Sequence, residues 1–156
     1  MSRQLDPRVP PEVRAILDAD LASSVGVTLL LLTISPEGWP HQAMISCGEI
    51  AALSDERLAL ALWPSSTAAR ALAGGGRATL TLVLPPTAYA LRVEVEPAGE
   101  LETPLAGRLA RFSATVAAAT ADEAPYATIE SGVRYSLKDP DQVLARWREV
   151  REALLA

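Results

Sequence analysis

Residues 58–84 read LALALWPSSTAARALAGGGRATLTLVL, and they constrain the architecture more than any other part of the chain. The run Leu58–Trp63 is short and apolar, as buried strands are. Ser66–Ala73 follows as a short helix, because serine caps a helix well and the three glycines after it end one. In Ala78–Leu84 threonine alternates with leucine, which predicts a half-buried strand.

On the N-terminal side the pattern predicts one helix and then strands joined by tight turns. Pro10 and Pro11 precede apolar residues at helical spacing, so a short amphipathic helix should begin there. Proline and glycine stand at turn positions between the apolar runs that follow. In chain order, the segments expected are a strand at Val25–Thr33, a turn at Ser35–Gly38, a strand at Pro40–Cys47, and a strand at Ile50–Leu53 that pairs with Leu58–Trp63.

On the C-terminal side, Tyr89–Glu96 has the cleanest alternation of apolar and charged residues and predicts a strand. Thr103–Ala119 is expected to be a long helix, capped by the threonine and with proline at its first position. Tyr126–Leu137 should be a further strand, and Asp139 should begin a final amphipathic helix. Because most strands would pair with sequence neighbours, we expect a mainly β, antiparallel sheet closed into a small barrel, in a single domain of residues 1–156.

The composition is that of a globular protein, and it excludes several classes of function. Hydrophobic residues make up 49% and charged residues 21% of the chain, which favours a folded domain over a disordered one. The formal net charge of -5, without any run of Lys or Arg, disfavours binding to nucleic acid or to an anionic membrane surface. One histidine and one cysteine cannot build a zinc or haem site within one chain, so no metal is expected.

Cysteine usage and the apolar segments indicate the cytoplasm. Cys47 is alone, so no intrachain disulfide can form. The first twenty residues carry several acidic side chains and no continuous apolar run, unlike a signal peptide. The longest apolar stretch, Val25–Ile34, is too short to span a bilayer. We therefore expect a cytoplasmic protein that does not cross a membrane.

The start of the predicted helix is a candidate anion-binding site. Ser65, Ser66 and Thr67 carry hydroxyl groups, and Arg70 lies one turn further along. Backbone N–H groups, the positive end of the helix dipole and the guanidinium could converge there on a phosphate. The same residues could equally form an ordinary helix cap beside a solvated arginine, with no ligand.

Three segments, in this order, resemble the pyridoxamine 5'-phosphate oxidase-like family of FMN-binding split β-barrels. They are Ile34–His41 (ISPEGWPH), Ser66–Leu72 (STAARAL) and Gly75–Leu80 (GGRATL). The likeness covers roughly Val25–Glu100, and it is the ordered set rather than any single motif that carries it. It implies a six-stranded antiparallel split β-barrel with flanking helices, an FMN cofactor, and a homodimer with FMN at its interface.

Through this resemblance, the strand after the turn is expected to contact the flavin, and the helix start to hold its phosphate. The cofactor-binding residues expected on this basis are His41, Gln42, Ala43, Met44, Ile45, Ser46, Trp63, Ser65, Ser66, Thr67 and Arg70. The chain departs from the family where many relatives have Arg-Lys, here Thr67-Ala68, and where a basic strand residue is frequent, here Ser46. Charged contacts to phosphate contribute about 1.5–3 kcal/mol each, so the loss of two weakens FMN binding by roughly two to four decades.

No side chain is expected to act as a catalytic acid, base or nucleophile. His41 has no identified acidic partner, so no catalytic triad can be assembled, although its ring could hydrogen-bond a flavin. Cys47 is expected to be a small buried hydrophobe. Trp39 and Trp63 suit core or dimer packing as well as stacking on a ring.

Two functions remain open at this point. The first is a small FMN-dependent oxidoreductase, in which the flavin carries the hydride or electron chemistry. The second is a non-catalytic split-barrel dimer that binds another small ligand or has lost flavin. Uptake of FMN by the purified protein, followed by turnover assays, would distinguish them.

Overall fold

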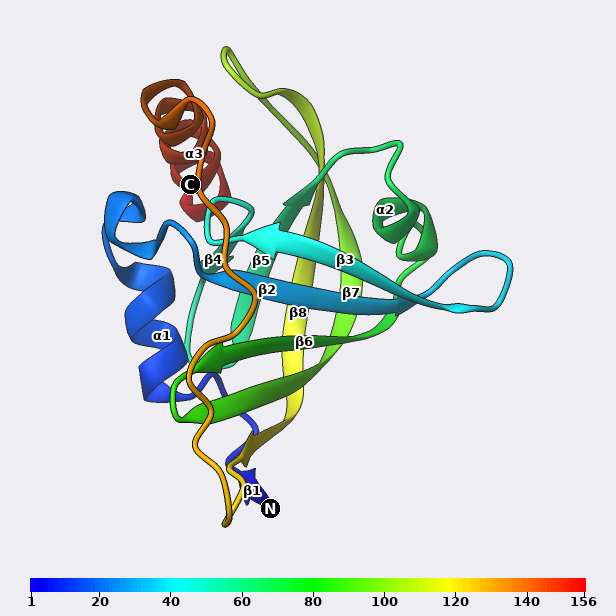
Figure 1. Ribbon diagram of the computed structural model, residues 1–156. Helices are drawn as coiled ribbons and strands as arrows, with labels where there is room; N and C mark the ends of the chain where they lie inside the picture. Colours follow the sequence, from blue (N-terminus) through cyan, green and yellow to red (C-terminus); the bar gives the residue numbers. More distant parts are fainter.

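The computed structural model describes all residues, Met1–Ala156, as one antiparallel sheet of eight strands with three α-helices and a 3-10 helix around it (Figure 1). The strands are β1 (Ser2–Leu5), β2 (Thr28–Ile34), β3 (Pro40–Ser46), β4 (Ile50–Ala52), β5 (Arg57–Leu62), β6 (Gly76–Leu84), β7 (Thr87–Thr103) and β8 (Gly107–Asp122). The helices are α1 (Pro11–Asp18), η1 (Leu21–Ser24), α2 (Thr67–Ala71) and α3 (Pro140–Leu155).

The order of the strands shows how the sheet forms a barrel. Its main path is β3-β2-β6-β7-β8-β5-β4, and β1 pairs with the far end of β8. The two edge strands, β3 and β4, are joined by only Cys47–Glu49, so the sheet must curl until its edges meet. These edges share no ladder of hydrogen bonds. The expected mainly β fold, a split barrel with flanking helices, is therefore confirmed, with eight strands in its sheet instead of six.

The interior of the barrel is filled by alternate residues of the central strands. Leu29 and Leu31 of β2, Leu60 of β5 and Leu80 of β6 are at most 1% exposed and belong to one cluster of 29 buried residues. Helix α1 covers one opening, where Val13 is fully buried. Burial of one such side chain contributes about 1.5–3 kcal/mol relative to its exposure, which makes this cluster the main source of stability.

The expected helix over Thr103–Ala119 is wrong, because these residues form the turn and second strand of a long β-hairpin. Thr103 does accept a hydrogen bond from the Ala106 N–H at 2.9 Å, but this bond closes the turn from β7 into β8. In β8, Phe112 and Val116 are buried and alternate with more exposed residues. Pairing with β7 and β5 on both sides overrides the helix preference of the many alanines.

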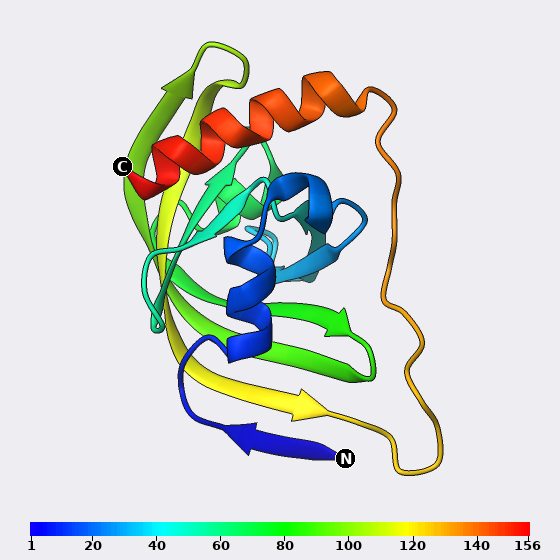
Figure 2. The same ribbon diagram turned by 90° about the vertical axis from the view of Figure 1, so that its left-hand side faces the viewer.

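The expected strand over Tyr126–Leu137 is also wrong. Residues 123–139 run as an extended connection from β8 to α3 and pair with no strand (Figure 2). They are held by side chains instead: the ring of Tyr135 packs edge-on against Trp147 with centroids 6.4 Å apart. The strand Ser2–Leu5 was not expected, because a four-residue strand without a buried face has no distinct sequence pattern.

The strand expected over Tyr89–Glu96 is present, but β7 runs seven residues further, to Thr103, because it pairs with β8 along its length. The other expected elements agree with the structure to within a few residues. Helix α2 is capped as expected, because Ser66 Oγ accepts from the Ala69 N–H at 3.1 Å. Helix α3 begins after Asp139, whose Oδ1 accepts from the Gln142 N–H at 3.4 Å. None of the helices combines the length and the apolarity needed to cross a lipid bilayer.

Candidate functional site

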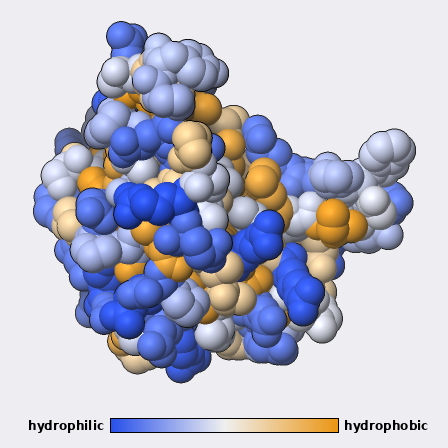
Figure 3. All heavy atoms as spheres, turned by 90° about the horizontal axis from the view of Figure 1, so that it is seen from below, coloured by the Kyte–Doolittle hydropathy of each residue, from blue (hydrophilic) through white to orange (hydrophobic).

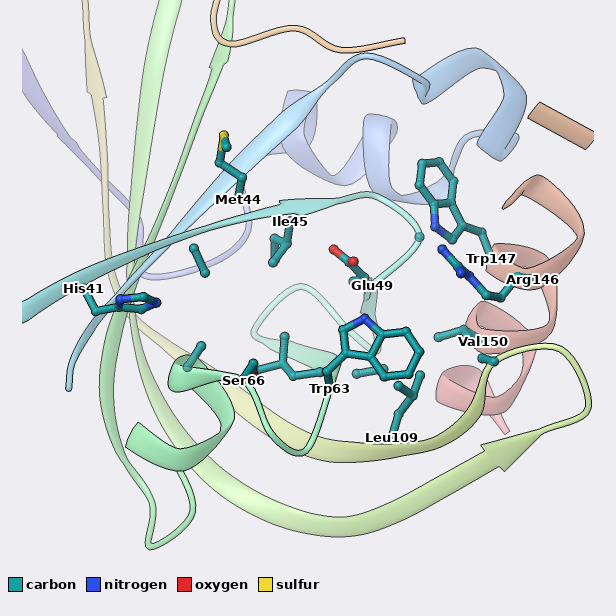
Figure 4. A pocket seen from close by; sticks show the side chains of 16 residues that line it. His41, Met44, Ile45, Glu49, Trp63, Ser66, Leu109, Arg146, Trp147 and Val150 are labelled. Atoms are coloured by element: carbon teal, nitrogen blue, oxygen red, sulfur yellow. The ribbon is translucent and has the colours of Figure 1, made fainter. Parts of the chain in front are cut away.

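A hollow lies where strands β3 and β5, the tip of the β7–β8 hairpin and helix α3 face one another (Figure 4). Its volume is about 140 Å³, and 11 of its 16 lining residues are hydrophobic. An apolar hollow with a few polar groups is the usual form of a small-ligand site. Sites that enclose a drug-sized ligand measure roughly 300–1,000 Å³, so this chain alone surrounds only part of a ligand of that size.

Strand β3 forms one wall of the hollow. Side chains alternate along a strand, and His41, Ala43 and Ile45 therefore share the face that lines the hollow. Gln42 lies on the other face and is exposed. Met44 borders the hollow, but its side chain points away from Ile45 (Figure 4). Strand β3 is an edge strand and pairs only with β2, so its other edge is free of hydrogen-bonded neighbours.

Trp63 occupies the centre of the hollow (Figure 4). It follows the last residue of β5, where the chain leaves the sheet and Pro64 starts the turn into α2. The side chain remains 53% exposed, although a tryptophan has much apolar surface to bury. Its ring is therefore available to a ligand, and the barrel interior does not use it.

The start of α2 borders the hollow only through Ser66 and Ala68. The Ser66 oxygen is engaged in capping the helix, which leaves its O–H free to donate. Ala68 is 2% exposed, so a long charged side chain would not fit there without repacking the core. Arg70 is exposed, and its Nη2 lies 3.5 Å from Thr67 Oγ1 at the limit of a hydrogen bond.

The structure brings about half of the expected site residues together. Those that line the hollow are His41, Ala43, Met44, Ile45, Trp63 and Ser66. Those that do not are Gln42, Ser46, Ser65, Thr67 and Arg70. Ser46 is engaged in the β3–β4 turn, where its Oγ accepts from the Gly48 N–H at 3.2 Å. Ser65 is exposed next to the hollow.

Glu49 is the most unusual residue of the hollow, and it was not among the expected site residues. It lies in the β3–β4 turn, and its Oε2 accepts from the Ser46 N–H at 2.7 Å. Burial raises the pKa of the Glu49 carboxyl above its ordinary value, while hydrogen bonds from Ser46 and the positive charge of Arg146 oppose that rise. Its position directly after the buried end of a strand was the available signal.

Helix α3 contributes a wall that the sequence did not reveal, with Arg146, Trp147 and Val150. Its position is fixed from both sides: the Leu105 N–H donates to Glu149 at 2.9 Å, and Arg111 donates to the carbonyl oxygens of the last turn. A Cβ at Gly48 would lie only 2.1 Å from Trp147 Cγ, so the turn can approach the helix only with glycine. About 100 residues separate this wall from β3 in the chain, so only the fold shows that they meet.

Other groups offer no further chemistry. Cys47 is fully buried, and this burial raises the pKa of its thiol, so it is a core residue and a poor nucleophile. No three side chains of His, Cys, Asp or Glu converge in a way that could hold a metal ion. The hollow can contact one side of a flat, largely apolar group, with possible donors at His41, Ser66 and Arg146 and an acceptor at Glu49.

Comparison with solved structures shows which fold this is. A crystal structure from Lactobacillus delbrueckii, provisionally named a pyridoxamine 5'-phosphate oxidase, matches 75% of this chain and 98% of its own with a TM-score of 0.57 and 13% identity. A structure named F420 reductase matches 71% of this chain and 98% of its own with a TM-score of 0.51 and 15% identity. At such low identity the likeness concerns the fold alone, which is the split β-barrel of pyridoxamine 5'-phosphate oxidase-like proteins.

Comparison of sequences shows which proteins are related to this chain. No protein-family model matches the chain. An uncharacterized protein of Bacillus subtilis (strain 168), YclD, is 38% identical over 125 residues, which are 80% of this chain and 80% of that protein. The chain therefore belongs to the same family as Bacillus subtilis YclD.

Proposed function

We propose that this protein binds FMN in the hollow between β3, β5 and α3 and acts as a small flavin-dependent oxidoreductase. The observation that carries the proposal is the convergence of His41, Ala43 and Ile45 with Trp63 and Ser66 around one apolar hollow. The fold adds support, because solved structures with it include proteins named as a pyridoxamine 5'-phosphate oxidase and as an F420 reductase.

The residues of the hollow suit the ring of a flavin. When bound, FMN supplies the hydride or electron transfer, and the protein needs only to bind and orient it and to exclude water. Trp63 offers a flat apolar surface for the ring. Ala43 and Ile45 of β3 form an apolar wall of the same hollow. His41 and Ser66 can donate hydrogen bonds at one end of the hollow.

The phosphate is proposed to lie over the start of α2. Ser65, Thr67 and Arg70 are at the surface there, next to Ser66 at the rim of the hollow. Arg70 is the one cation of this group, and its weak contact with Thr67 leaves most of its N–H groups free for an anion. Gln42 and Ser46 are not near enough to the hollow to share in this role, except through the backbone of β3.

A second copy of the chain is proposed to complete the site, as a homodimer. The β2–β3 hairpin stands away from the body of the molecule (Figures 1 and 3). On and beside it, Ile34 is 59%, Trp39 74% and Met44 65% exposed. Large apolar side chains gathered on one projecting element are typical of an interface. The small volume of the hollow in one chain agrees with a ligand that is covered partly by a partner.

One observation favours the alternative, a split-barrel dimer that binds another small ligand without catalysis or has lost flavin. Thr67 and the buried Ala68 occupy the positions where related proteins carry two cations, and Ser66 is already used as a helix cap. The phosphate would then depend on Arg70 alone in this chain.

Titration of the purified protein with FMN, followed by the fluorescence of the flavin, distinguishes the two. Saturable quenching with one FMN per chain supports the proposal. Turnover of the FMN-loaded protein with a nicotinamide or reduced deazaflavin donor would then separate an enzyme from a binder. Unchanged FMN fluorescence at high protein concentration contradicts the proposal and supports the alternative.

A further inference from the structure

Glu49 and Arg146 form a pair of opposite charges at the end of the hollow away from His41 (Figure 4). Neither charge is fully used by the protein. Glu49 accepts one hydrogen bond through Oε2, from the Ser46 N–H at 2.7 Å, which leaves Oε1 without a partner. The guanidinium of Arg146 makes no hydrogen bond to any other residue, although it can donate five.

The two side chains are close enough to influence each other but are not joined. The charge of Arg146 acts on the carboxyl of Glu49, yet every ion pair with N···O within 4.0 Å in this chain involves other residues. The space between a carboxylate and a guanidinium that do not touch can accept a polar group of a ligand. The pair therefore places an acceptor and several donors on the wall of one hollow.

The β3–β4 turn uses only one oxygen of Glu49, which accepts from the Ser46 N–H. Partial removal of a carboxylate from water is costly unless it is paired, and Glu49 forms no ion pair within 4.0 Å. A partly buried carboxylate with a raised pKa that lines a hollow is a candidate for function. Cys47 is buried and Tyr135 is partly buried, and neither carries a positive charge. The cation Arg151 acts on Cys47, whereas Arg146 is the cation that acts on Glu49.

The combination of charges restricts the ligand. A simple cation would be repelled by Arg146, and a simple anion by Glu49. A neutral group with an N–H beside a carbonyl satisfies both, because the carboxylate accepts from the N–H and the guanidinium donates to the carbonyl oxygen. The apolar walls and the exposed ring of Trp63 require that this group be part of a flat ring.

We propose that Glu49 and Arg146 bind the imide edge of a planar heterocycle, with Glu49 accepting from the ring N–H and Arg146 donating to the adjacent carbonyl. The inference deepens the proposed function and rests on it, because the flavin ring has such an edge opposite its ribityl chain. A substrate with the same edge would be recognised by the same chemistry. The pair determines which rings enter the hollow and in which orientation.

The test uses the ring without the phosphate, so that it does not depend on the α2 end of the site. Lumiflavin, whose only N–H is that of the imide, and 3-methyllumiflavin, which lacks it, are titrated into the intact protein by calorimetry. We expect methylation to weaken binding by about tenfold, as for a lost hydrogen bond to a charged group. Glu49→Gln should weaken lumiflavin binding by about fivefold and leave the binding of 3-methyllumiflavin unchanged.

A variant at Arg146 tests the second member of the pair, and two variants on the same helix serve as controls. Arg146→Met should weaken both rings by about tenfold, because both keep the carbonyl. Arg148→Met and Glu152→Gln, on exposed positions of the same helix, should change neither affinity. At Glu49, a variant that acts only through structure would weaken both rings equally. For Arg146→Met, an unchanged midpoint of unfolding in urea excludes a structural cause. Equal losses for Glu49→Gln, equal binding of both rings by the unaltered protein, or binding of neither would overturn the inference.

Addition of FMN separates this inference from the proposed function. If FMN displaces lumiflavin, the pair binds the imide edge of the flavin. If both bind together, the pair binds the same edge of a substrate, and either result supports the inference. If lumiflavin binds in a Glu49-dependent way but FMN does not bind, the inference stands and the FMN proposal fails. If FMN binds and neither Glu49→Gln nor methylation at the ring N–H matters, the inference fails and the FMN proposal stands.

Discussion

The interior of the barrel and the hollow beside it lie on neighbouring parts of the same sheet, and they are built by different rules. In the interior, Leu29, Leu60 and Leu80 are at most 1% exposed and belong to one hydrophobic cluster. In the hollow, Trp63 stays 53% exposed, and the partly buried Glu49 accepts a hydrogen bond through only one of its two oxygens. The interior stabilises the fold by burying apolar side chains. The hollow keeps an apolar ring that is not buried and charged groups that are not paired. This difference is the physical reason to place a ligand in the hollow.

The largest expected effect is the loss of stability when the interior is altered. Leu60→Ala should lower the free energy of unfolding by about 2–5 kcal/mol, because it leaves a cavity in a close-packed core. Trp63→Ala should change it by less than about 1 kcal/mol, because most of that side chain is exposed. Denaturation in urea measures both. Similar losses for the two variants would remove the distinction between interior and hollow.

The next effect is on ligand binding, where a change in the hollow should matter although it hardly alters stability. Trp63→Ala should weaken FMN binding by about tenfold, because a ring stacked on an aromatic side chain gains about 1–3 kcal/mol. Tyr126→Ala, at an aromatic residue that is 90% exposed in the connection to α3, is the matched control and should have no effect. Fluorescence titration gives both dissociation constants. An unchanged constant for Trp63→Ala would exclude stacking on this ring.

A similar effect is expected at the phosphate end, where it should depend on the phosphate. Arg70→Ala should weaken FMN binding by about tenfold and leave riboflavin binding unchanged, because riboflavin lacks the charged group. Arg77→Ala, at an exposed arginine of β6, serves as the control. If Arg70→Ala leaves the FMN constant as it was, Arg70 is not part of the site and the alternative without flavin gains weight.

The smallest effect is a dependence of stability on pH that arises from Glu49. Burial raises the pKa of this carboxyl in the folded state above its unfolded value, so the folded state holds its proton to higher pH. Stability from this group is therefore complete below the unfolded pKa and falls as pH rises through the folded pKa. Glu49→Gln should be more stable than the unaltered protein at neutral pH, and the gap should close near pH 4. Thermal unfolding across this range measures it; a gap that widens as pH falls would show that the carboxylate stabilises the fold.

The segment from β2 to β6 was predictable from the sequence because its signals are local. Apolar runs, turns with proline and glycine, and a serine cap at Ser66 fixed each element without knowledge of the rest. The β8 strand was mistaken for a helix because its alternation of Phe112, Ala114 and Val116 is hidden among alanines that favour helices in isolation. Its pairing with β7 and β5 is a tertiary effect that no local pattern contains.

The candidate site divides in the same way. The family resemblance pointed to the whole of residues 41–46 and to the connection at Trp63–Thr67, and the fold then brings His41, Ala43, Ile45, Trp63 and Ser66 to one hollow. Arg146 and Trp147 could not be assigned from the sequence, because they reach the hollow from a helix at the other end of the chain. Residues contributed by long-range packing become visible only when the fold is known.

A crystal structure of the protein grown with FMN tests the central claim most directly, since that claim is that the hollow is the ligand site. The account predicts the flavin ring against Trp63 and β3, with its ribityl phosphate directed toward α2. Flavin bound at another surface, or side chains closing the hollow while FMN is bound elsewhere, would contradict it.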